Sequence, residues 1–247
     1  MKNKQARYPC LNFALLHGSL PAKKGKSVFR HRERENLKYY PVFWDITGKK
    51  CVVIGGGDVA ARKVARLLDC DAKVCVVSPV LVPELEVLKK DQRIEHIDDE
   101  YAGEYLYGAS LVIGATDDEK VNAAISRDAK TKGIPVNIVD DPQKCDFILP
   151  SLVERGDLTI ACSTGGNSPA LARHLREELE ETYGEEYATL LNILGQLRMK
   201  MEKNAGVGKT WFDQLMAAGL LDAIRQKQGD RVKQIIYDIT GWEVAID

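Results

Sequence analysis

The sequence has no uninterrupted apolar run of the roughly 18 residues that a membrane-spanning helix needs. A short apolar stretch near the N-terminus, residues 10–16, is interrupted by Asn12, and no small-residue cleavage site follows it, which disfavours a secretory signal. Positive charge is not in excess either, because 35 Lys and Arg residues are balanced by 36 Asp and Glu residues. This balance is not that of a general nucleic-acid binder. We therefore expect neither nucleic acid nor a membrane among the partners of this protein.

The six cysteines form no C-x-x-C pair and no cluster with histidine at the spacing of a zinc site. Cys51, Cys75 and Cys162 lie in apolar runs that are typical of strands, where a free thiol behaves as a small apolar group. Disulfides are rare in reducing compartments, so this usage favours a cytoplasmic protein. No set of metal ligands can be named from the sequence.

Residues 1–38 lack periodicity and predict a disordered extension. From residue 39 the pattern changes, because short apolar, β-rich runs alternate with helical stretches. Strands are expected at 50–54, 73–77, 94–97, 110–115 and 135–139, and helices at about 58–68, 84–90 and 119–131. This alternation with short loops predicts a Rossmann-like α/β domain with a parallel, doubly wound sheet over residues 39–146.

Residues 147–184 break the alternation. Apolar runs at 147–153 and 158–162 flank a turn at 154–157 and predict a β-hairpin, which is followed by a helix from Pro169 to about residue 181. Leu171, Leu175 and Leu179 form one apolar stripe on that helix, typical of a core or an interface. Residues 185–247 predict a helical C-terminal domain, with helices at about 186–204, 211–226 and 231–237.

The run from Gly55 to Ala60 matches the pattern G-x-G-x-x-G/A between an expected strand and an expected helix. Gly55 permits a tight turn, Gly57 lets the backbone approach a pyrophosphate, and Ala60 keeps the helix close to the sheet. The N-terminus of the helix offers N–H groups and a positive dipole end to the phosphates. The alternative is a tight turn without a ligand.

Two further loops at the carboxyl edge of the sheet complete the expected dinucleotide site. The second strand ends in Ser78-Pro79 in place of the usual acid, so the motif does not choose between NAD and NADP. Ala115-Thr116-Asp117 closes the fourth strand, and Thr116 also has capping-box spacing to Glu119. The predicted cofactor-binding residues are Gly55, Gly56, Gly57, Asp58, Val59, Ala60, Ser78, Pro79, Ala115, Thr116 and Asp117.

Two more segments carry polar groups that suit chemistry. Asp140-Asp141-Pro142 ends the fifth strand, and its carboxylates serve either proton transfer or a turn before proline. The segment 163–169 ends in a candidate N-cap and a proline at the first helical position, and its glycines could leave several N–H groups open to an anion. An ordinary capped helix is the alternative. The predicted substrate-binding residues are Thr164, Gly165, Gly166, Asn167, Ser168 and Arg173.

These blocks resemble the precorrin-2 dehydrogenases, which form the N-terminal module of siroheme synthases. The resemblance rests on residues 40–43, 51–63, 115–118, 136–140, 147–151 and 163–173, in the right order, and covers about residues 39–205. It implies NAD-dependent oxidation of precorrin-2 to sirohydrochlorin in siroheme biosynthesis. It leaves open a second, lyase activity in which ferrous iron is a substrate and is inserted into sirohydrochlorin.

The resemblance also assigns roles and an assembly. The family's catalytic aspartate falls on Asp140, and a family serine near the tetrapyrrole falls on Thr164. The anionic substrate suits the open N–H groups of residues 165–168, together with Arg173 and Lys144. The family forms homodimers, so residues 147–184 are expected to be an α+β dimerisation region. Fused siroheme synthases also carry a methyltransferase half, which is not expected here because the chain stops at Asp247. Precorrin-2 is therefore expected from a separate enzyme.

Two other functions stay open at this point. A non-catalytic NAD-sensing regulatory module would share the glycine loop but would not need the block at 163–173. A dehydrogenase of small hydroxy acids would need a catalytic histidine or lysine, and of the four histidines only His174 lies near an expected site.

Overall fold

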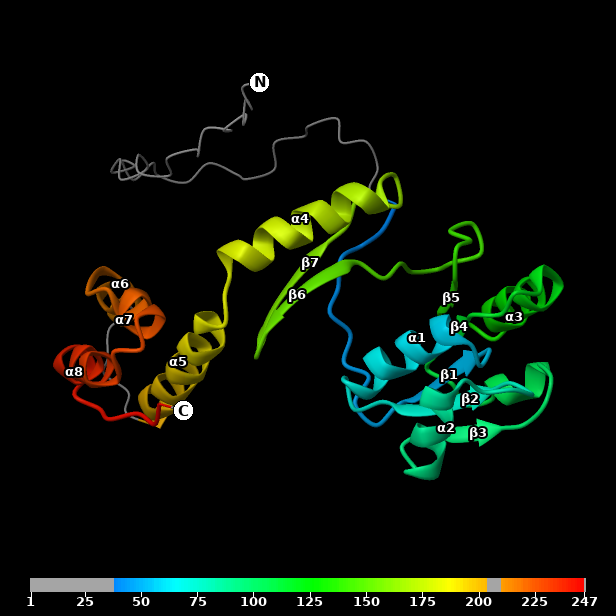
Figure 1. Ribbon diagram of the computed structural model, residues 1–247, viewed down its shortest axis with the longest axis horizontal. Helices are drawn as coiled ribbons and strands as arrows, with labels where there is room; N and C mark the ends of the chain where they lie inside the picture. Colours follow the sequence, from blue (N-terminus) through cyan, green and yellow to red (C-terminus); the bar gives the residue numbers. More distant parts are fainter. Residues whose placement is uncertain (1–37, 204–209, 247) are drawn as a thin grey trace, which may run out of the picture. The chain divides into compact units, whose positions relative to one another are not determined.

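The computed structural model describes residues 38–203 and 210–246 (Figure 1). Apart from Lys38, the extension predicted at residues 1–38 lies outside the described residues. The account below therefore concerns the α/β domain, the hairpin with its helix, and the C-terminal helices.

The α/β domain contains a five-stranded, wholly parallel sheet in the order β3-β2-β1-β4-β5, which confirms the predicted Rossmann-like fold. Its strands are β1 (Lys50–Ile54), β2 (Lys73–Val77), β3 (Glu95–Ile97), β4 (Leu111–Gly114) and β5 (Val136–Ile138). The chain runs outward from β1 to β3 and then returns to β4 on the other side of β1. Ligands of open α/β sheets bind where the strand order reverses in this way, at the carboxyl ends of the strands.

Helices cover both faces of the sheet because successive residues of each buried strand point to opposite sides. Val53 joins the core under α1 (Asp58–Leu68) and α2 (Pro83–Lys90). Val52 joins the core under the 3-10 helix η1 (Gly103–Leu106) and α3 (Glu119–Thr131). Both valines are fully buried, as expected for a strand covered on both faces.

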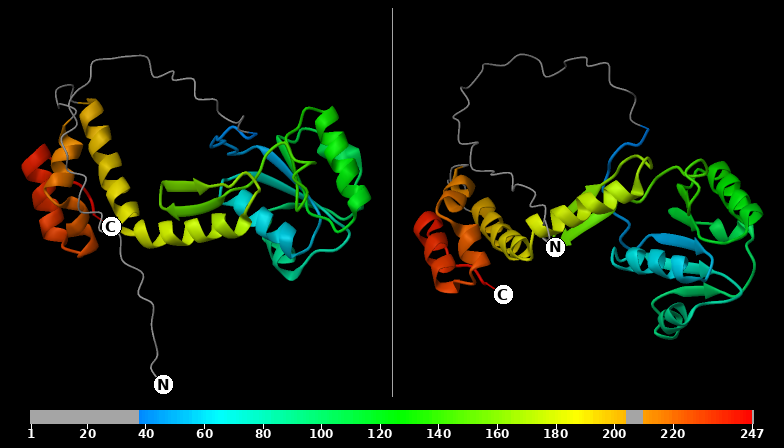
Figure 2. Two further views of the ribbon diagram at one scale, coloured as in Figure 1. Left: turned by 90° about the horizontal axis from the view of Figure 1, so that it is seen from above. Right: turned by 45° about the horizontal axis from the view of Figure 1, so that its top comes forward.

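The hairpin forms from β6 (Ser151–Arg155) and β7 (Leu158–Cys162), and α4 (Pro169–Thr182) lies along it (Figures 1 and 2). The prediction placed the first strand at 147–153 and the turn at 154–157, which is four residues too early at the strand's start. Pro150 cannot donate a ladder hydrogen bond. Phe147 packs against the core of the α/β domain, and its carbonyl accepts a hydrogen bond of 2.9 Å from the Asn137 side chain. At its other end β6 continues to Arg155, so the turn is limited to Gly156 and Asp157.

The C-terminal region is helical, as predicted, with α5 (Glu186–Lys203), α6 (Trp211–Ala217), α7 (Leu220–Arg225) and α8 (Gly229–Thr240). The expected single helix over 211–226 is wrong, because Gly219 adopts a left-handed conformation with φ +81° and separates α6 from α7. Among the residues that the structure describes, no helix has both the length and the apolar character needed to cross a membrane.

Two of the three leucines in the apolar stripe of α4 are left exposed by the described part of the chain. Leu171 and Leu175 are 47% and 38% exposed, and Ala172 is the buried residue of this helix. The sequence left two interpretations of this stripe open, a core or an interface. The exposure of Leu171 and Leu175 favours the interface.

Candidate cofactor and substrate site

The glycine loop after β1 is held by its neighbours on both sides. Gly55 has φ +119°, and a Cβ there would lie less than 3.0 Å from the carbonyl oxygen of Ala115. A Cβ on Gly56 would likewise lie less than 3.0 Å from the carbonyl oxygen of Val80. Glycine at these two positions therefore allows the loops after β1, β2 and β4 to pack directly against one another.

Gly57 differs from its neighbours because its α-carbon faces open space. A Cβ built on it meets no protein atom within 4 Å, and its backbone is extended at φ −86°, ψ −176°. Gly57 is also the N-cap of α1, and no side chain of the described residues caps this helix end. The first-turn N–H groups, which start at Asp58, are thus open to a phosphate. These features fit the pyrophosphate of a dinucleotide.

The second cofactor loop is built around Ser78. Its hydroxyl donates to the carbonyl of Val80 at 2.8 Å, and its own carbonyl lies 2.9 Å from Nε2 of His96 on β3. Pro79 is exposed beside them. The hydroxyl of Ser78 is therefore engaged in its own turn, and no carboxylate takes its place at the end of β2. Local sequence patterns do not connect His96 with this loop, because the contact depends on the pairing of β2 with β3.

Thr116 does not cap α3, which corrects the capping-box expectation. Asp118 is the N-cap, since its carboxylate accepts the N–H groups of Lys120 at 2.7 Å and Val121 at 3.2 Å. The Thr116 hydroxyl instead donates to the side chain of Asn122 at 3.0 Å, and the Asn122 amide donates back to the Thr116 carbonyl at 2.8 Å. This side-chain clamp fixes the loop that faces Gly55.

Asn122 was missed by the sequence prediction, although it is buried, with 7% exposure. A buried amide needs hydrogen-bond partners, and Asn122 finds them in Thr116. Asp117, which was predicted to contact the cofactor, is exposed at the same sheet edge. The structure thus brings Gly55, Ala115 and Thr116 together at the carboxyl ends of β1 and β4.

Asp140 stands just beyond β5 at this same edge. Its side chain is exposed, and its backbone is left-handed with φ +61°. Such a conformation costs about 1 kcal/mol or more in a residue that is not glycine, and it persists where the surroundings hold it. Among the described residues, Asp140 has no hydrogen-bond or ion-pair partner for its carboxylate. The carboxylate is therefore available to a ligand.

The loop after Asp140 is tightly bonded. The Asp141 carboxylate accepts the Gln143 N–H at 3.1 Å and binds the Lys144 ammonium, which lowers the pKa of this carboxyl group. The Cys145 sulfur contacts the Ile138 N–H at 3.1 Å and the Asp141 carbonyl at 3.1 Å. These bonds close the loop onto the end of β5 and account for the left-handed residue that starts it.

Lys144 is not free to bind a substrate carboxylate, contrary to the role suggested by the sequence. Its ammonium contacts the carboxylates of both Asp141 and Glu119. These contacts raise the pKa of Lys144, with the Asp141 hydrogen bond as the largest cause. The positive charge is thus already neutralised by the protein.

Three of the four N–H groups of residues 165–168 are used within the loop, so the expectation that several of them stay open is wrong. The Gly165 N–H donates to Ser163 Oγ at 3.1 Å, the Asn167 N–H to the Thr164 carbonyl at 3.1 Å, and the Ser168 N–H to Thr164 Oγ1 at 3.1 Å. Ser168 caps α4 as predicted, because its Oγ accepts the Leu171 N–H at 3.2 Å.

What remains open near this loop is small. Gly165 and Gly166 are left-handed, with φ +65° and +90°, and a Cβ on either meets no atom within 4 Å. Arg173, one turn into α4, is exposed and has no partner among the described residues. Its guanidinium, the Gly166 N–H and the exposed side-chain amide of Asn167 are groups that this segment offers to an anion.

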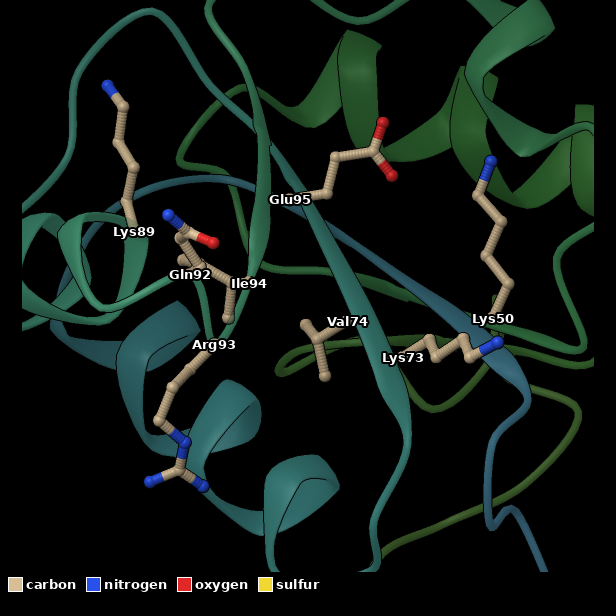
Figure 3. Close-up of a pocket in the computed structure, with 8 residues that line it drawn as sticks. All are labelled: Lys50, Lys73, Val74, Lys89, Gln92, Arg93, Ile94 and Glu95. Atoms are coloured by element: carbon tan, nitrogen blue, oxygen red, sulfur yellow. The ribbon is translucent and has the colours of Figure 1, made fainter.

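A separate hollow lies at the opposite edge of the sheet, near the starts of β1, β2 and β3 (Figure 3). It has an apolar floor of Val74 and Ile94 and a rim rich in cations. Figure 3 shows that the ends of Lys89 and Arg93 point away from each other and from Lys50. Because these charges do not converge, the hollow is not an anion site. Among the described residues, no group of three or more His, Cys, Asp or Glu side chains could hold a metal ion.

Comparison with known proteins identifies two regions that match family models. Residues 42–151 match the family model described as putative NAD(P)-binding, and residues 155–182 match the model described as sirohaem biosynthesis protein central. The siroheme synthase of Photobacterium profundum is 34% identical over 207 residues, which are 83% of this chain and 44% of that protein. The siroheme synthase of Methylobacillus flagellatus is 41% identical over 173 residues, 70% of this chain and 37% of that protein.

The chain thus spans less than half of the length of these curated relatives. A solved structure, that of SirC, precorrin-2 dehydrogenase, superposes with a TM-score of 0.64 at 26% identity, covering 80% of this chain and 98% of that one. The resemblance drawn from the motifs is confirmed by these matches. The chain belongs to the siroheme synthase family, of which it carries the NAD(P)-binding and central regions.

Proposed function

We propose that this protein is an NAD-dependent precorrin-2 dehydrogenase, an oxidoreductase that converts precorrin-2 to sirohydrochlorin. One observation carries the proposal. The free carboxylate of Asp140 stands at the same sheet edge as Gly57 and the open N–H groups at the start of α1. The family membership and the likeness to SirC over nearly all of that chain support the choice of substrate. NAD, when bound, supplies the hydride acceptor.

The oxidation removes one hydrogen of the macrocycle with its electron pair and a second as a proton. We assign the proton to the Asp140 carboxylate, because it is exposed and has no hydrogen-bond or ion-pair partner among the described residues. The first turn of α1, after Gly57, would hold the dinucleotide phosphates through its N–H groups. Ala115 and Thr116, clamped by Asn122, would shape the floor of the site.

The left-handed backbone at Asp140 supports this assignment. Strained conformations gather at functional sites, where the surrounding structure over-determines them. Here the bonds of Asp141 and Cys145 close the loop, and none of them uses the Asp140 side chain. A carboxylate that only served the turn would be expected to accept N–H groups, as Asp141 does.

Asp140→Asn tests the role of this residue, because asparagine keeps the size and tolerates the left-handed backbone. We expect turnover to fall by about 10²- to 10⁴-fold, the usual contribution of a positioned base. The measurement is an anaerobic optical assay of sirohydrochlorin and NADH formation from precorrin-2 and NAD. Asp91→Asn, an exposed change at the end of α2, is the matched control.

Full turnover by a folded Asp140→Asn protein would remove Asp140 from the mechanism. An unmodified protein that binds NAD but neither binds nor oxidises the tetrapyrrole would favour the regulatory NAD-sensing module. Insertion of ferrous iron, the lyase activity implied by the resemblance, stays a prediction; iron consumption after sirohydrochlorin has formed tests it in the same cuvette.

We also propose that the working form is a homodimer joined through the hairpin and α4. An isolated two-stranded sheet is marginally stable and leaves unpaired strand edges, so β6 and β7 need further cover. The exposed Leu171 and Leu175 of α4, with Leu149 at 48% exposure before β6, offer an apolar surface for it. A second copy of this chain covers that surface in the proposed assembly.

The double change Leu171→Glu/Leu175→Glu should convert the dimer to a monomer, as measured by sedimentation velocity. Val87→Glu, an exposed change on α2, is the control and should leave the mass unchanged. A monomeric unmodified protein, or a double variant that stays dimeric, would contradict the proposed interface.

We also propose that the protein is located in the cytoplasm. The five cysteines in the described part of the chain are free thiols. Burial raises the pKa of the Cys51 and Cys75 thiols to about 11, so both stay protonated and serve as apolar core groups. Cell fractionation with an antibody to the protein tests the location.

A further inference from the structure

Lys63 lies in the second turn of α1, next to Val64, which packs against the sheet. Arg66, three residues further along α1, forms an ion pair of 2.7 Å with Glu154 on β6, so the chain between β5 and β6 passes beside α1. This path brings the Asp140 carboxylate close enough for its charge to act on the Lys63 ammonium. Lys63 is therefore a cation at the carboxyl edge of the sheet, beside the proposed base.

The Lys63 side chain is half-buried and has no hydrogen-bond or ion-pair partner among the described residues. Burial lowers the pKa of Lys63, the neighbouring Arg62 lowers it further, and Asp140 opposes both. Removing an ammonium from water without pairing it is unfavourable, so such a group favours an incoming anion. Lys144 shows the contrast, since it is already bound by two carboxylates.

We propose that Lys63 binds a carboxylate of the tetrapyrrole substrate beside Asp140. This inference rests on the proposed function, because precorrin-2 and sirohydrochlorin carry many carboxylates around the macrocycle. A charge-assisted hydrogen bond from Lys63 anchors one of them and thereby holds the macrocycle against the Asp140 carboxylate. Lys63 takes over the anchoring role that the sequence suggested for Lys144.

The position of Lys63 suits a substrate anchor better than a phosphate ligand. The open N–H groups of α1 lie in its first turn, whereas Lys63 is in the second turn, where the charge of Asp140 acts on it. A phosphate-binding Lys63 would change the affinity for NAD, and a carboxylate-binding Lys63 would not. The two roles are thus separable by measuring each ligand alone.

The test compares Lys63→Gln and Lys63→Arg with the control Arg62→Gln, which removes an adjacent but exposed charge. Sirohydrochlorin binding is measured by optical titration without NAD, and NAD binding by calorimetry without tetrapyrrole. We expect Lys63→Gln to weaken sirohydrochlorin binding by about tenfold to a hundredfold, the effect of losing one charged hydrogen bond. Lys63→Arg should restore most of the affinity, and the NAD affinity should stay unchanged in all variants.

A second ligand sharpens the result. A sirohydrochlorin analogue with methyl-esterified carboxylates should bind the unmodified protein and Lys63→Gln equally, because it offers no anion to Lys63. Circular dichroism melting curves check that each variant is folded, and Lys63→Met, which also removes the charge, replaces Lys63→Gln if that variant is not.

The outcomes separate the two proposals. If the unmodified protein fails to bind sirohydrochlorin, the proposed function falls and the Lys63 anchor with it. If the unmodified protein binds and Lys63→Gln binds equally well, the anchor alone is overturned. An equal loss in Arg62→Gln, or a loss of NAD affinity in Lys63→Gln, also overturns it.

Discussion

The three consecutive glycines after β1 should respond very differently to alanine, and Gly57→Ala is the most informative change. The extended backbone of Gly57 accepts any residue, and the added Cβ meets no atom within 4 Å. The free energy of unfolding should therefore change by less than about 1 kcal/mol, the balance of a weaker N-cap and a stiffer unfolded chain. The same Cβ occupies the space through which a phosphate reaches the α1 N–H groups. We expect the Kd for NAD to rise by at least about tenfold.

Gly55→Ala should have the opposite profile. At φ +119° alanine is strained, which costs about 1–3 kcal/mol. Its Cβ would also lie less than 3.0 Å from the Ala115 carbonyl oxygen, a backbone atom directly after β4. Together, the strain and the clash are expected to lower the free energy of unfolding by more than about 2 kcal/mol. For a chain of this size that lowers the melting temperature by about 5–10 °C.

Thermal unfolding by circular dichroism, with and without saturating NAD, separates the two effects, and calorimetric titration gives the Kd of each variant. Gly57→Ala should melt like the unmodified protein without NAD but show a smaller rise in melting temperature when NAD is added. Unchanged NAD affinity in Gly57→Ala would refute the phosphate-binding role of Gly57 and the open N–H groups at the start of α1. Early melting of Gly57→Ala, comparable with that of Gly55→Ala, would refute the assignment of open space at this position.

Two further changes probe the supports of the site. Asn122→Leu keeps the side-chain volume but removes both hydrogen bonds to Thr116. Urea unfolding should show a loss of about 1–3 kcal/mol in the free energy of unfolding, and calorimetry should show a weaker affinity for NAD. Unchanged stability would mean that the clamp is dispensable. Lys144→Met tests a pH dependence. The Lys144 hydrogen bond lowers the pKa of the Asp141 carboxyl in the folded state, so its stabilisation is present above the unfolded pKa near 4 and is lost as the pH falls through the lower, folded value. The stability difference between unmodified and variant protein should therefore shrink below about pH 4 in urea unfolding at pH 3–7, and a constant difference would contradict the assignment.

Local patterns predicted much of this fold. The bounds of β1, α1, β2 and α3 follow from buried apolar runs, glycine at a strand end and helical periodicity, all of which act within a few residues. The parallel sheet follows from the alternation itself, since parallel strands need crossover helices. The glycine motif and the ordered blocks were sufficient to place the chain in its family.

Errors arose where a remote partner or a single glycine decided the outcome. Phe147 is held by Asn137 and the α/β core, which delays β6 beyond the apolar run that predicted it. Gly219 divides an apolar helical pattern because its backbone turns left-handed. Periodicity does not report such a reversal, since both halves keep the same spacing of apolar residues.

The sequence by itself determined which segments are buried, where the strands end, and which residue types stand at the edge where ligands bind. Tertiary structure decided the state of those residues. It paired Lys144 with two acids and closed the N–H groups of residues 165, 167 and 168. It left Lys63 and Asp140 without a hydrogen bond or ion pair to any described residue. The physical reason is that burial follows local apolar patterning, whereas the charge and hydrogen-bonding capacity that a side chain keeps for a ligand depends on groups far away in the sequence.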